Sequence, residues 1–175
     1  MTQLKTPPSR TVTSHEVEQY LRALKLAFIA EHYGELAQHA AHKQWSHLDY
    51  LGHLVEGEAL LRQDRATTNR IRLARFPVLK TLDQLRWDWP TQINRAQVQH
   101  HFTLHFLGDH INLIYLGGVG LGKTHLATAL GYTACLKGHS VLFSSTIDVI
   151  NTLTAAKGAG RLKQEIKKNN DPSKG

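Results

Sequence analysis

The sequence predicts an α/β protein in which an N-terminal helical module precedes the first, incomplete part of a three-layer αβα core. Three observations support this fold class. Apolar residues recur at three- and four-residue spacing within residues 14–76, as in amphipathic helices. Short continuous apolar runs at 112–116 and 141–143 are typical of buried parallel strands. A glycine-rich loop and a helical pattern follow the first of these runs.

Composition excludes several classes of protein. The chain has 175 residues, of which 41% are hydrophobic and 20% charged, so its composition is globular. No apolar run approaches the roughly 20 residues that cross a bilayer, and the N-terminus lacks the apolar segment of a signal peptide. The single cysteine, Cys135, cannot form an internal disulfide. We therefore expect a cytoplasmic protein with no membrane partner.

The N-terminal elements follow from capping signals. Residues 1–13 are expected to form a disordered arm. Thr13 and Glu16 have the spacing of a capping box, and an apolar stripe predicts a helix from there to about residue 32. Gly34 then marks the end of this helix or a bend, with further helix through residue 41. Ser46, with Asp49 three residues later, starts a long helix that runs to about residue 74.

The remaining boundaries follow from prolines, glycines and changes of period. The helical module covers 14–76, and 77–94 form an ordered linker that we expect Trp87 and Trp89 to anchor. A partial nucleotide-binding domain spans 95–168, and 169–175 form a disordered tail. Within that domain we expect helices at about 95–107, 123–136 and 146–156, and strands at 112–116 and 141–143.

Residues 117–124, Gly-Gly-Val-Gly-Leu-Gly-Lys-Thr, match the phosphate-binding pattern G-x-x-x-x-G-K-S/T in full. Glycines let successive backbone N–H groups face phosphate oxygens, and the following helix adds the positive end of its dipole. Lys123 supplies a charge to the β- and γ-phosphates, and Thr124 a hydroxyl to Mg²⁺. The predicted nucleotide-binding residues are Gly117, Gly118, Val119, Gly120, Leu121, Gly122, Lys123, Thr124 and His125. The alternative is a glycine-rich turn that binds nothing.

Base choice and hydrolysis depend on other residues. ATP is preferred to GTP only because the N-K-x-D signature of GTP-binding proteins does not occur in the chain. Hydrolysis needs a second acidic site at a neighbouring strand end, and no Asp-Glu pair occurs in these 175 residues. Asp148 falls inside the next predicted helix, where a first-turn acid is favoured by the helix dipole. The sequence therefore predicts ATP and Mg²⁺ binding without hydrolysis and offers no catalytic residue.

A run of basic residues ends the helical module. Lysine and arginine give the whole chain a net charge of +7. Between residues 62 and 80 one acid, Asp64, stands against Arg62, Arg65, Arg70, Arg72, Arg75 and Lys80. Because residues three or seven apart share a helix face, we predict that the five arginines bind the phosphate backbone of duplex DNA. The alternative is a solvated basic face paired with Glu56 and Glu58.

The run 116–131, Leu-Gly-Gly-Val-Gly-Leu-Gly-Lys-Thr-His-Leu-Ala-Thr-Ala-Leu-Gly, resembles the nucleotide loop of the IstB-like ATP-binding proteins. These are transposition helper ATPases of insertion sequences, related to the DnaC helicase loaders within the AAA+ class of P-loop proteins. Segments 20–26, 56–58 and 72–77 are similar to that family's N-terminal domain, and 80–82 to its bridge to the ATPase core. The resemblance covers residues 14–168.

The resemblance implies an accessory protein that binds ATP and duplex DNA, forms homo-oligomers on DNA and assists a transposase. Its nucleotide loop would be residues 117–124. The family's Walker B acid, sensor residue and arginine finger have no counterpart in this sequence, so we expect a truncated copy or fragment. Two alternatives stay open, a small P-loop kinase and a DNA-binding module whose nucleotide loop is vestigial.

Overall fold

The computed structural model describes residues 12–88 and 93–170, with side chains described as far as residue 167. It divides into two compact units, an N-terminal unit (1–65) and a C-terminal unit (66–175). Most of the expected disordered arm, Trp89 of the linker and residues 171–175 of the tail lie outside the described residues. No helix in the described ranges is long and apolar enough to span a membrane.

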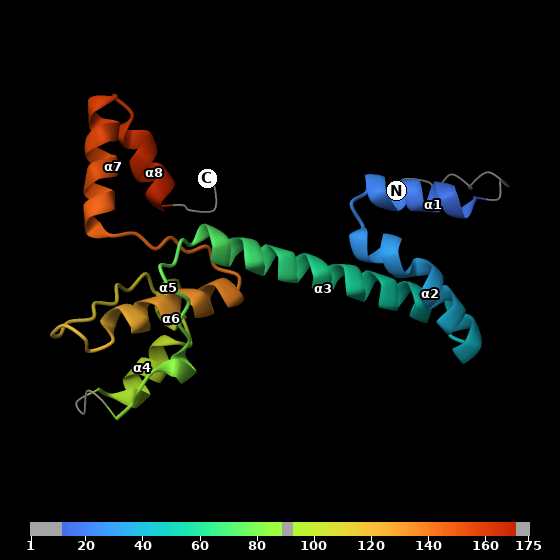
Figure 1. Ribbon diagram of the computed structural model, residues 1–175, viewed down its shortest axis with the longest axis horizontal. Helices are drawn as coiled ribbons and strands as arrows, with labels where there is room; N and C mark the ends of the chain where they lie inside the picture. Colours follow the sequence, from blue (N-terminus) through green and yellow to red (C-terminus); the bar gives the residue numbers. More distant parts are fainter. Residues whose placement is uncertain (1–11, 89–92, 171–175) are drawn as a thin grey trace. The chain divides into compact units, whose positions relative to one another are not determined.

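The N-terminal unit contains α1 (Ser14–Ala23), α2 (Ala27–Lys43) and the first part of α3 (His47–Leu73), labelled in Figure 1. Both predicted helix starts are confirmed. The Thr13 hydroxyl accepts a hydrogen bond from the Glu16 amide at 3.3 Å, and the Glu16 carboxylate accepts one from the Thr13 amide at 3.0 Å. At the start of α3 the Ser46 hydroxyl accepts from the Asp49 amide at 3.1 Å. The Thr13 and Ser46 hydroxyls thus each accept from a first-turn amide that has no partner within its helix.

The prediction of one helix through residue 32 is wrong. Helix α1 ends at Ala23, and Lys25, two residues later, adopts a left-handed conformation with a φ of 57°. The amide of Leu26 closes this end by bonding to the Leu21 carbonyl at 2.9 Å. Gly34 lies inside α2, so it does not end a helix. Glycine usually supplies the left-handed residue at such a stop, so a lysine there leaves no signal in the sequence.

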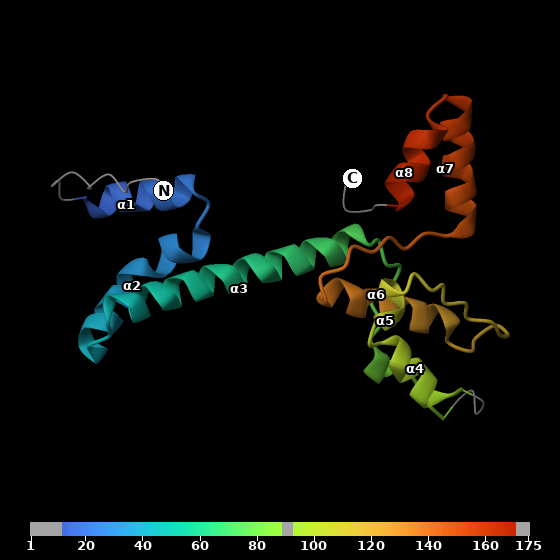
Figure 2. The same ribbon diagram turned by 180° about the vertical axis from the view of Figure 1, so that it is seen from behind.

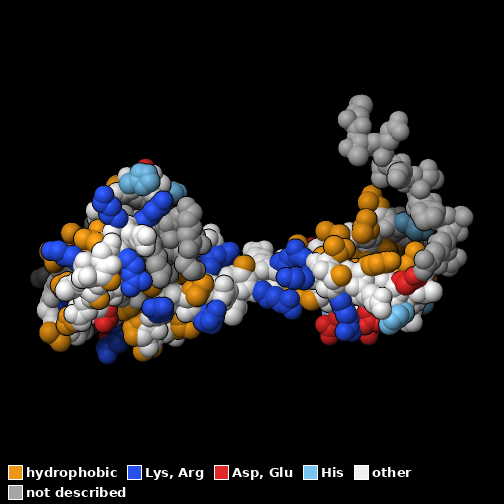
Figure 3. Space-filling view, turned by 90° about the horizontal axis from the view of Figure 1, so that it is seen from above, with side chains coloured by type: hydrophobic (Ala, Val, Ile, Leu, Met, Phe, Trp, Pro, Cys, Tyr) orange, Lys and Arg blue, Asp and Glu red, His pale blue; other side chains and the backbone are white. Residues whose placement is uncertain are grey.

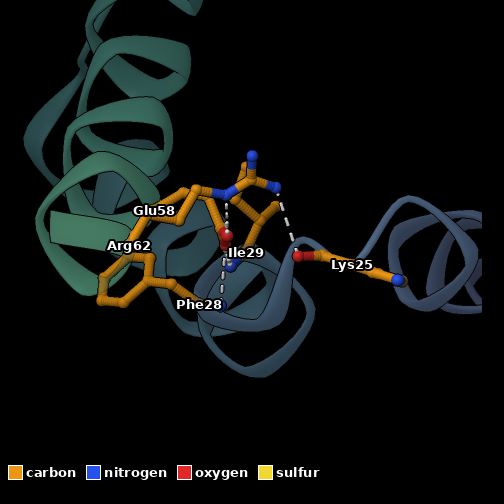
Figure 4. A network of polar contacts seen from close by, with 5 residues as sticks. All are labelled: Lys25, Phe28, Ile29, Glu58 and Arg62. Atoms are coloured by element: carbon orange, nitrogen blue, oxygen red, sulfur yellow. Dashed lines mark hydrogen bonds and ion pairs between the residues drawn. The ribbon is translucent and has the colours of Figure 1, made fainter. Parts of the chain in front are cut away.

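A buried carboxylate joins α3 to the start of α2. Glu58 is 5% exposed, and its Oε2 accepts the amides of Phe28 and Ile29 at 2.9 and 3.4 Å. Its Oε1 accepts from Arg62 Nε at 3.0 Å, and Arg62 Nη2 donates to the Lys25 carbonyl at 3.3 Å (Figure 4). The residue before α2 has no capping side chain, so Glu58 from another helix performs that role.

Gly57, next to Glu58, allows α2 and α3 to approach closely. A Cβ atom at this position would overlap the ring of Phe28, which itself stacks on His32 with a centroid distance of 4.3 Å. The absence of a side chain at Gly57 therefore lets Glu58 reach the first amides of α2.

The C-terminal unit contains the end of α3 and the helices η1 (Leu82–Gln84), α4 (Arg95–His101), α5 (His105–Gly108), α6 (Lys123–Leu136), α7 (Thr146–Gly158) and α8 (Leu162–Asn170). α7 and α8 lie side by side in both Figure 1 and Figure 2. The hydrophobic cluster of the C-terminal unit has Leu85, Val98 and Leu126 at its centre. Around them pack Leu82, Trp87, Ile93, Phe102 and Tyr115, so the expected anchoring role of Trp87 is confirmed.

The predicted α/β class is wrong, because the described part of the chain contains helices and no strand. Residues 112–116 and 141–143 have no regular secondary structure and pair with no strand among the described residues. Ile114 and Leu116 are 77% and 89% exposed, and the Phe143 amide bonds to the Ala74 carbonyl at the end of α3. A strand exists only through hydrogen bonds to another strand, which a local apolar pattern cannot supply. No three-layer αβα core is present in the described residues.

Other boundaries differ in smaller ways. The helix predicted over 95–107 divides into α4 and α5, because Leu104 adopts a φ of 69°. The polar segment after Gly160, where we predicted no element, forms α8. The predictions for α6 and for the start of α7 are confirmed, since α6 spans Lys123–Leu136 and α7 begins at Thr146.

Two glycines of α3 provide a test of the close approach. Gly57→Ala should lower the free energy of unfolding by about 1–3 kcal/mol, because the added methyl overpacks against Phe28. Gly52→Ala has nothing within 4 Å of the new methyl and should raise stability by up to about 1 kcal/mol through helix propensity. Urea unfolding, with hydrogen exchange of α2 amides as the readout, measures the free energy of unfolding of both variants. Equal effects of the two changes would contradict the close approach.

The stability of the N-terminal unit should depend on pH through Glu58. Burial raises the pKa of Glu58, but hydrogen bonds from Arg62 and from the Ile29 and Phe28 amides outweigh it, and the pKa lies below its ordinary value. The ionised form thus stabilises the fold above the unfolded pKa of about 4.3, and this contribution is lost as pH falls through the lower folded pKa.

Glu58→Gln should therefore cost about 1–2 kcal/mol at pH 7, and the difference from the wild type should shrink as pH falls through the lowered pKa of Glu58. The exposed carboxylate of Glu56, on the same helix, makes Glu56→Gln a matched control with an effect under about 0.5 kcal/mol. Exchange protection of α2 amides across pH 3–7 is the measurement. Parallel curves for Glu58→Gln and the wild type would show that this carboxylate does not titrate as proposed.

Candidate functional site

The glycine-rich loop occupies residues 117–122, between the irregular segment 111–116 and α6. Gly120 and Gly122 have φ values of 79° and 83°, in the left-handed region that favours glycine. Val119 at the loop tip is fully exposed. Gly122 is the N-cap of α6 and has no side chain to cap it, whereas α1, α4 and α7 begin with side-chain caps. The first-turn amides of α6 therefore have no partner from the cap residue.

Two side chains close over the loop. Lys123 Nζ donates to the Gly118 carbonyl, so the ammonium lies back across the loop backbone. Leu121 packs against the first glycine, because its Cδ1 is 3.3 Å from the place where a Cβ of Gly117 would stand. Thr124 in the first turn of α6 is exposed. Lys123, Thr124 and the loop glycines thus lie together at the start of one helix.

His125 is placed differently from the rest of the predicted set. Its Nε2 lies 2.8 Å from the Thr81 carbonyl of the linker. A carbonyl only accepts, so Nε2 carries the hydrogen of this bond. The structure therefore directs one ring nitrogen of His125 to the linker.

A cavity of about 920 Å³ opens elsewhere in the C-terminal unit, and residues 117–125 do not line it. Arg70, Arg75 and Asp148 are among its lining residues. The Asp148 amide donates to the Ser145 hydroxyl at 3.1 Å, and the Asp148 carboxylate accepts from that hydroxyl at 2.6 Å. Asp148 is therefore a first-turn acid of α7, as predicted.

The five predicted DNA-binding arginines fall into two groups. Arg62 and Arg70 are engaged within the fold. Arg62 pairs with Glu58, while Arg70 Nη1 donates to Thr67 Oγ1 and to the Cys135 carbonyl at 3.2 and 3.3 Å. The local alternative, pairing of the basic run with Glu58, thus holds for Arg62.

The other three guanidinium groups, those of Arg65, Arg72 and Arg75, are exposed. Arg72 also donates to the Asn69 side chain at 2.8 Å. Arg75 follows the end of α3 in a left-handed conformation with a φ of 57°. On the visible face of the C-terminal unit, at the left of Figure 3, blue Lys and Arg side chains outnumber red acidic ones.

Comparison with known proteins places the chain in a family. Residues 19–172 match the model of the IstB-like ATP binding proteins, and the chain belongs to that family. The resemblance inferred from the sequence is confirmed.

Three relatives come from insertion sequences and are named as ATP-binding proteins. The chain is 36% identical over 152 residues to that of IS21 from Pseudomonas aeruginosa, covering 87% of this chain and 57% of the relative. It is 28% identical over 151 residues to that of IS5376 from Geobacillus stearothermophilus, covering 86% and 60%. With that of IS232 from Bacillus thuringiensis subsp. berliner it shares 31% over 147 residues, covering 84% and 59%. The chain therefore spans about 60% of the length of these curated relatives.

Proposed function

We propose that this chain is an ATP-binding accessory protein of DNA transposition that holds Mg-ATP at residues 117–124. The observation that carries the proposal is the start of α6, where a glycine N-cap leaves the first amides without a capping side chain and an ammonium lies over the preceding loop. An anion with several oxygens fits this donor set, because amides, a helix dipole and a cation converge on it. Membership of the IstB-like family and the names of its relatives support the same ligand.

The chain's own residues have separate roles in this proposal. Lys123 leaves the neutral Gly118 carbonyl for a charged phosphate oxygen, which forms the stronger hydrogen bond. The exposed hydroxyl of Thr124 is a suitable oxygen ligand for Mg²⁺, which supplies charge neutralisation between the phosphates when bound. Asp148 is committed to Ser145 in α7, and we assign it no part in hydrolysis. We therefore propose that these residues bind Mg-ATP without hydrolysing it.

We also propose that Arg65, Arg72 and Arg75 contact the phosphate backbone of duplex DNA. They are exposed, and exposed guanidinium groups bind phosphate oxygens without reading sequence. Arg62 and Arg70, by contrast, hold the fold. The net charge of +7 favours a polyanionic partner. A transposase and further copies of the chain are the protein partners that the family context proposes.

One observation favours a second candidate, a DNA-binding module whose loop is vestigial. The loop is closed on itself, since Leu121 packs against Gly117 and Lys123 bonds to Gly118. In the first candidate a triphosphate displaces the lysine contact, whereas in the second nothing does. Nucleotide binding therefore separates the two.

Lys123→Ala should weaken binding of a fluorescent ATP analogue at least tenfold, because it removes the ammonium that lies over the loop. Lys157→Ala, which removes a lysine from the last turn of α7, should leave the affinity unchanged. Equilibrium titration with competition by unlabelled Mg-ATP is the measurement. Equal affinity of wild type and Lys123→Ala would remove the phosphate-loop proposal and leave the vestigial one.

The double change Arg72→Gln and Arg75→Gln should flatten the salt dependence of DNA affinity. Each lost phosphate contact lowers the slope of log affinity against log salt by about 0.9, so the pair should lower it by about 1.8. Arg86→Gln is a matched control, because Arg86 already pairs with Asp88 at 2.7 Å. Fluorescence anisotropy of a labelled duplex across a salt series measures the slope. Salt-independent binding by the wild type would rule out backbone contact.

A further inference from the structure

The start of α6 is attached to the linker by a contact that the nucleotide loop does not itself require. His125, in the first turn of α6, donates from Nε2 to the Thr81 carbonyl at 2.8 Å, across 44 residues of sequence. The Thr81 position is held in turn by a capping box with Gln84, whose side chain accepts the Thr81 amide at 3.3 Å. A well-defined piece of the linker therefore presents its carbonyl to His125.

Two apolar contacts continue this attachment, which we call the linker clasp (Thr81 and Leu85 with Gly122, His125 and Leu126). Leu85 is 9% exposed and clusters with Leu126 in the core of the unit. Its Cδ1 is also 3.5 Å from the place where a Cβ of Gly122 would stand, in ordinary van der Waals contact. The last glycine of the loop and the first turn of α6 thus share one neighbour, the linker.

We propose that His125 is a positioning residue that couples occupancy of the phosphate loop to the order of linker residues 81–88, and not a nucleotide ligand. The proposal rests on the proposed nucleotide function for its coupling, whereas the clasp itself is independent of any ligand. The Nε2–H donor of His125 is already used in the hydrogen bond to the Thr81 carbonyl.

The coupling follows from the position at which a change in the loop reaches the linker. Phosphate binding draws Lys123 away from Gly118 and changes the backbone of the loop. That change terminates at Gly122, which lies against Leu85, while His125 keeps the linker from separating. Holding residues 117–122 in one conformation therefore favours the docked linker, and by linkage a docked linker favours the bound nucleotide.

Hydrogen exchange of backbone amides tests both parts in the full chain. The linker amides 82–88 are compared in wild type, His125→Ala and His125→Gln, each without ligand and with a non-hydrolysable ATP analogue and Mg²⁺. Glutamine retains an N–H donor that reaches the carbonyl, so it should restore the clasp. His139→Ala, an exposed histidine beyond the end of α6, is the matched control.

Without ligand, linker exchange in His125→Ala should be about fivefold faster than in wild type, the ratio expected for one hydrogen bond. The glutamine variant and His139→Ala should match the wild type, and α6 amides should not change. The analogue should slow linker exchange in wild type and in the glutamine variant but not in His125→Ala. His125→Ala should still bind the analogue, within about threefold of wild-type affinity.

Three results would overturn the inference in distinguishable ways. Unchanged linker exchange in unliganded His125→Ala would remove the clasp. Loss of analogue binding in His125→Ala with an unchanged linker would make His125 a ligand. If the wild type binds no analogue, the proposed function fails and the coupling with it, while the unliganded comparison still decides whether the clasp exists.

Discussion

A single buried carboxylate organises the N-terminal unit. Glu58, on α3, is 5% exposed and needs several donors to remain ionised, because an unpaired buried charge is costly. The amides of Phe28 and Ile29 and the guanidinium of Arg62 supply them. This arrangement requires the helices to approach at Gly57, so the residue without a side chain and the buried acid depend on each other.

The need of polar groups for hydrogen-bond partners also explains where the two candidate sites, the nucleotide loop and the exposed arginines, lie. Helices α2 and α6 both begin without a capping side chain of their own. In α2 Glu58 supplies the missing acceptor, whereas in α6 the N-cap is Gly122, which has no side chain, and no other side chain in the described part of the chain is seen to cap the helix. An anion from outside can therefore serve at α6 and not at α2. The arginines divide similarly, since Arg62 and Arg70 donate to carbonyl groups in distant parts of the chain, whereas Arg72 bonds only to the nearby Asn69 among the contacts described.

Predictions from local pattern succeeded where the physics is local. A threonine or serine three residues before an acid caps its own helix, so the starts of α1 and α3 followed from the sequence. They failed at two helix ends, because Lys25 and Leu104 take left-handed conformations that glycine usually supplies. They failed for the strands, because an apolar run forms a strand only when a partner pairs with it. The placement of His125 depended on Thr81, a residue 44 positions away, and no local pattern reports such a contact.

The amino-acid order alone determined the phosphate-loop motif, the capped helix starts, the basic charge and the family, since each depends on neighbouring residues or on the string itself. Tertiary structure decided that Arg62 and Arg70 bond within the fold, where α1 ends, and that His125 holds the linker. It also decided that residues 112–116 and 141–143 form no sheet. The reason is that hydrogen-bond partners and buried neighbours come from distant parts of the chain, and only folding brings them together.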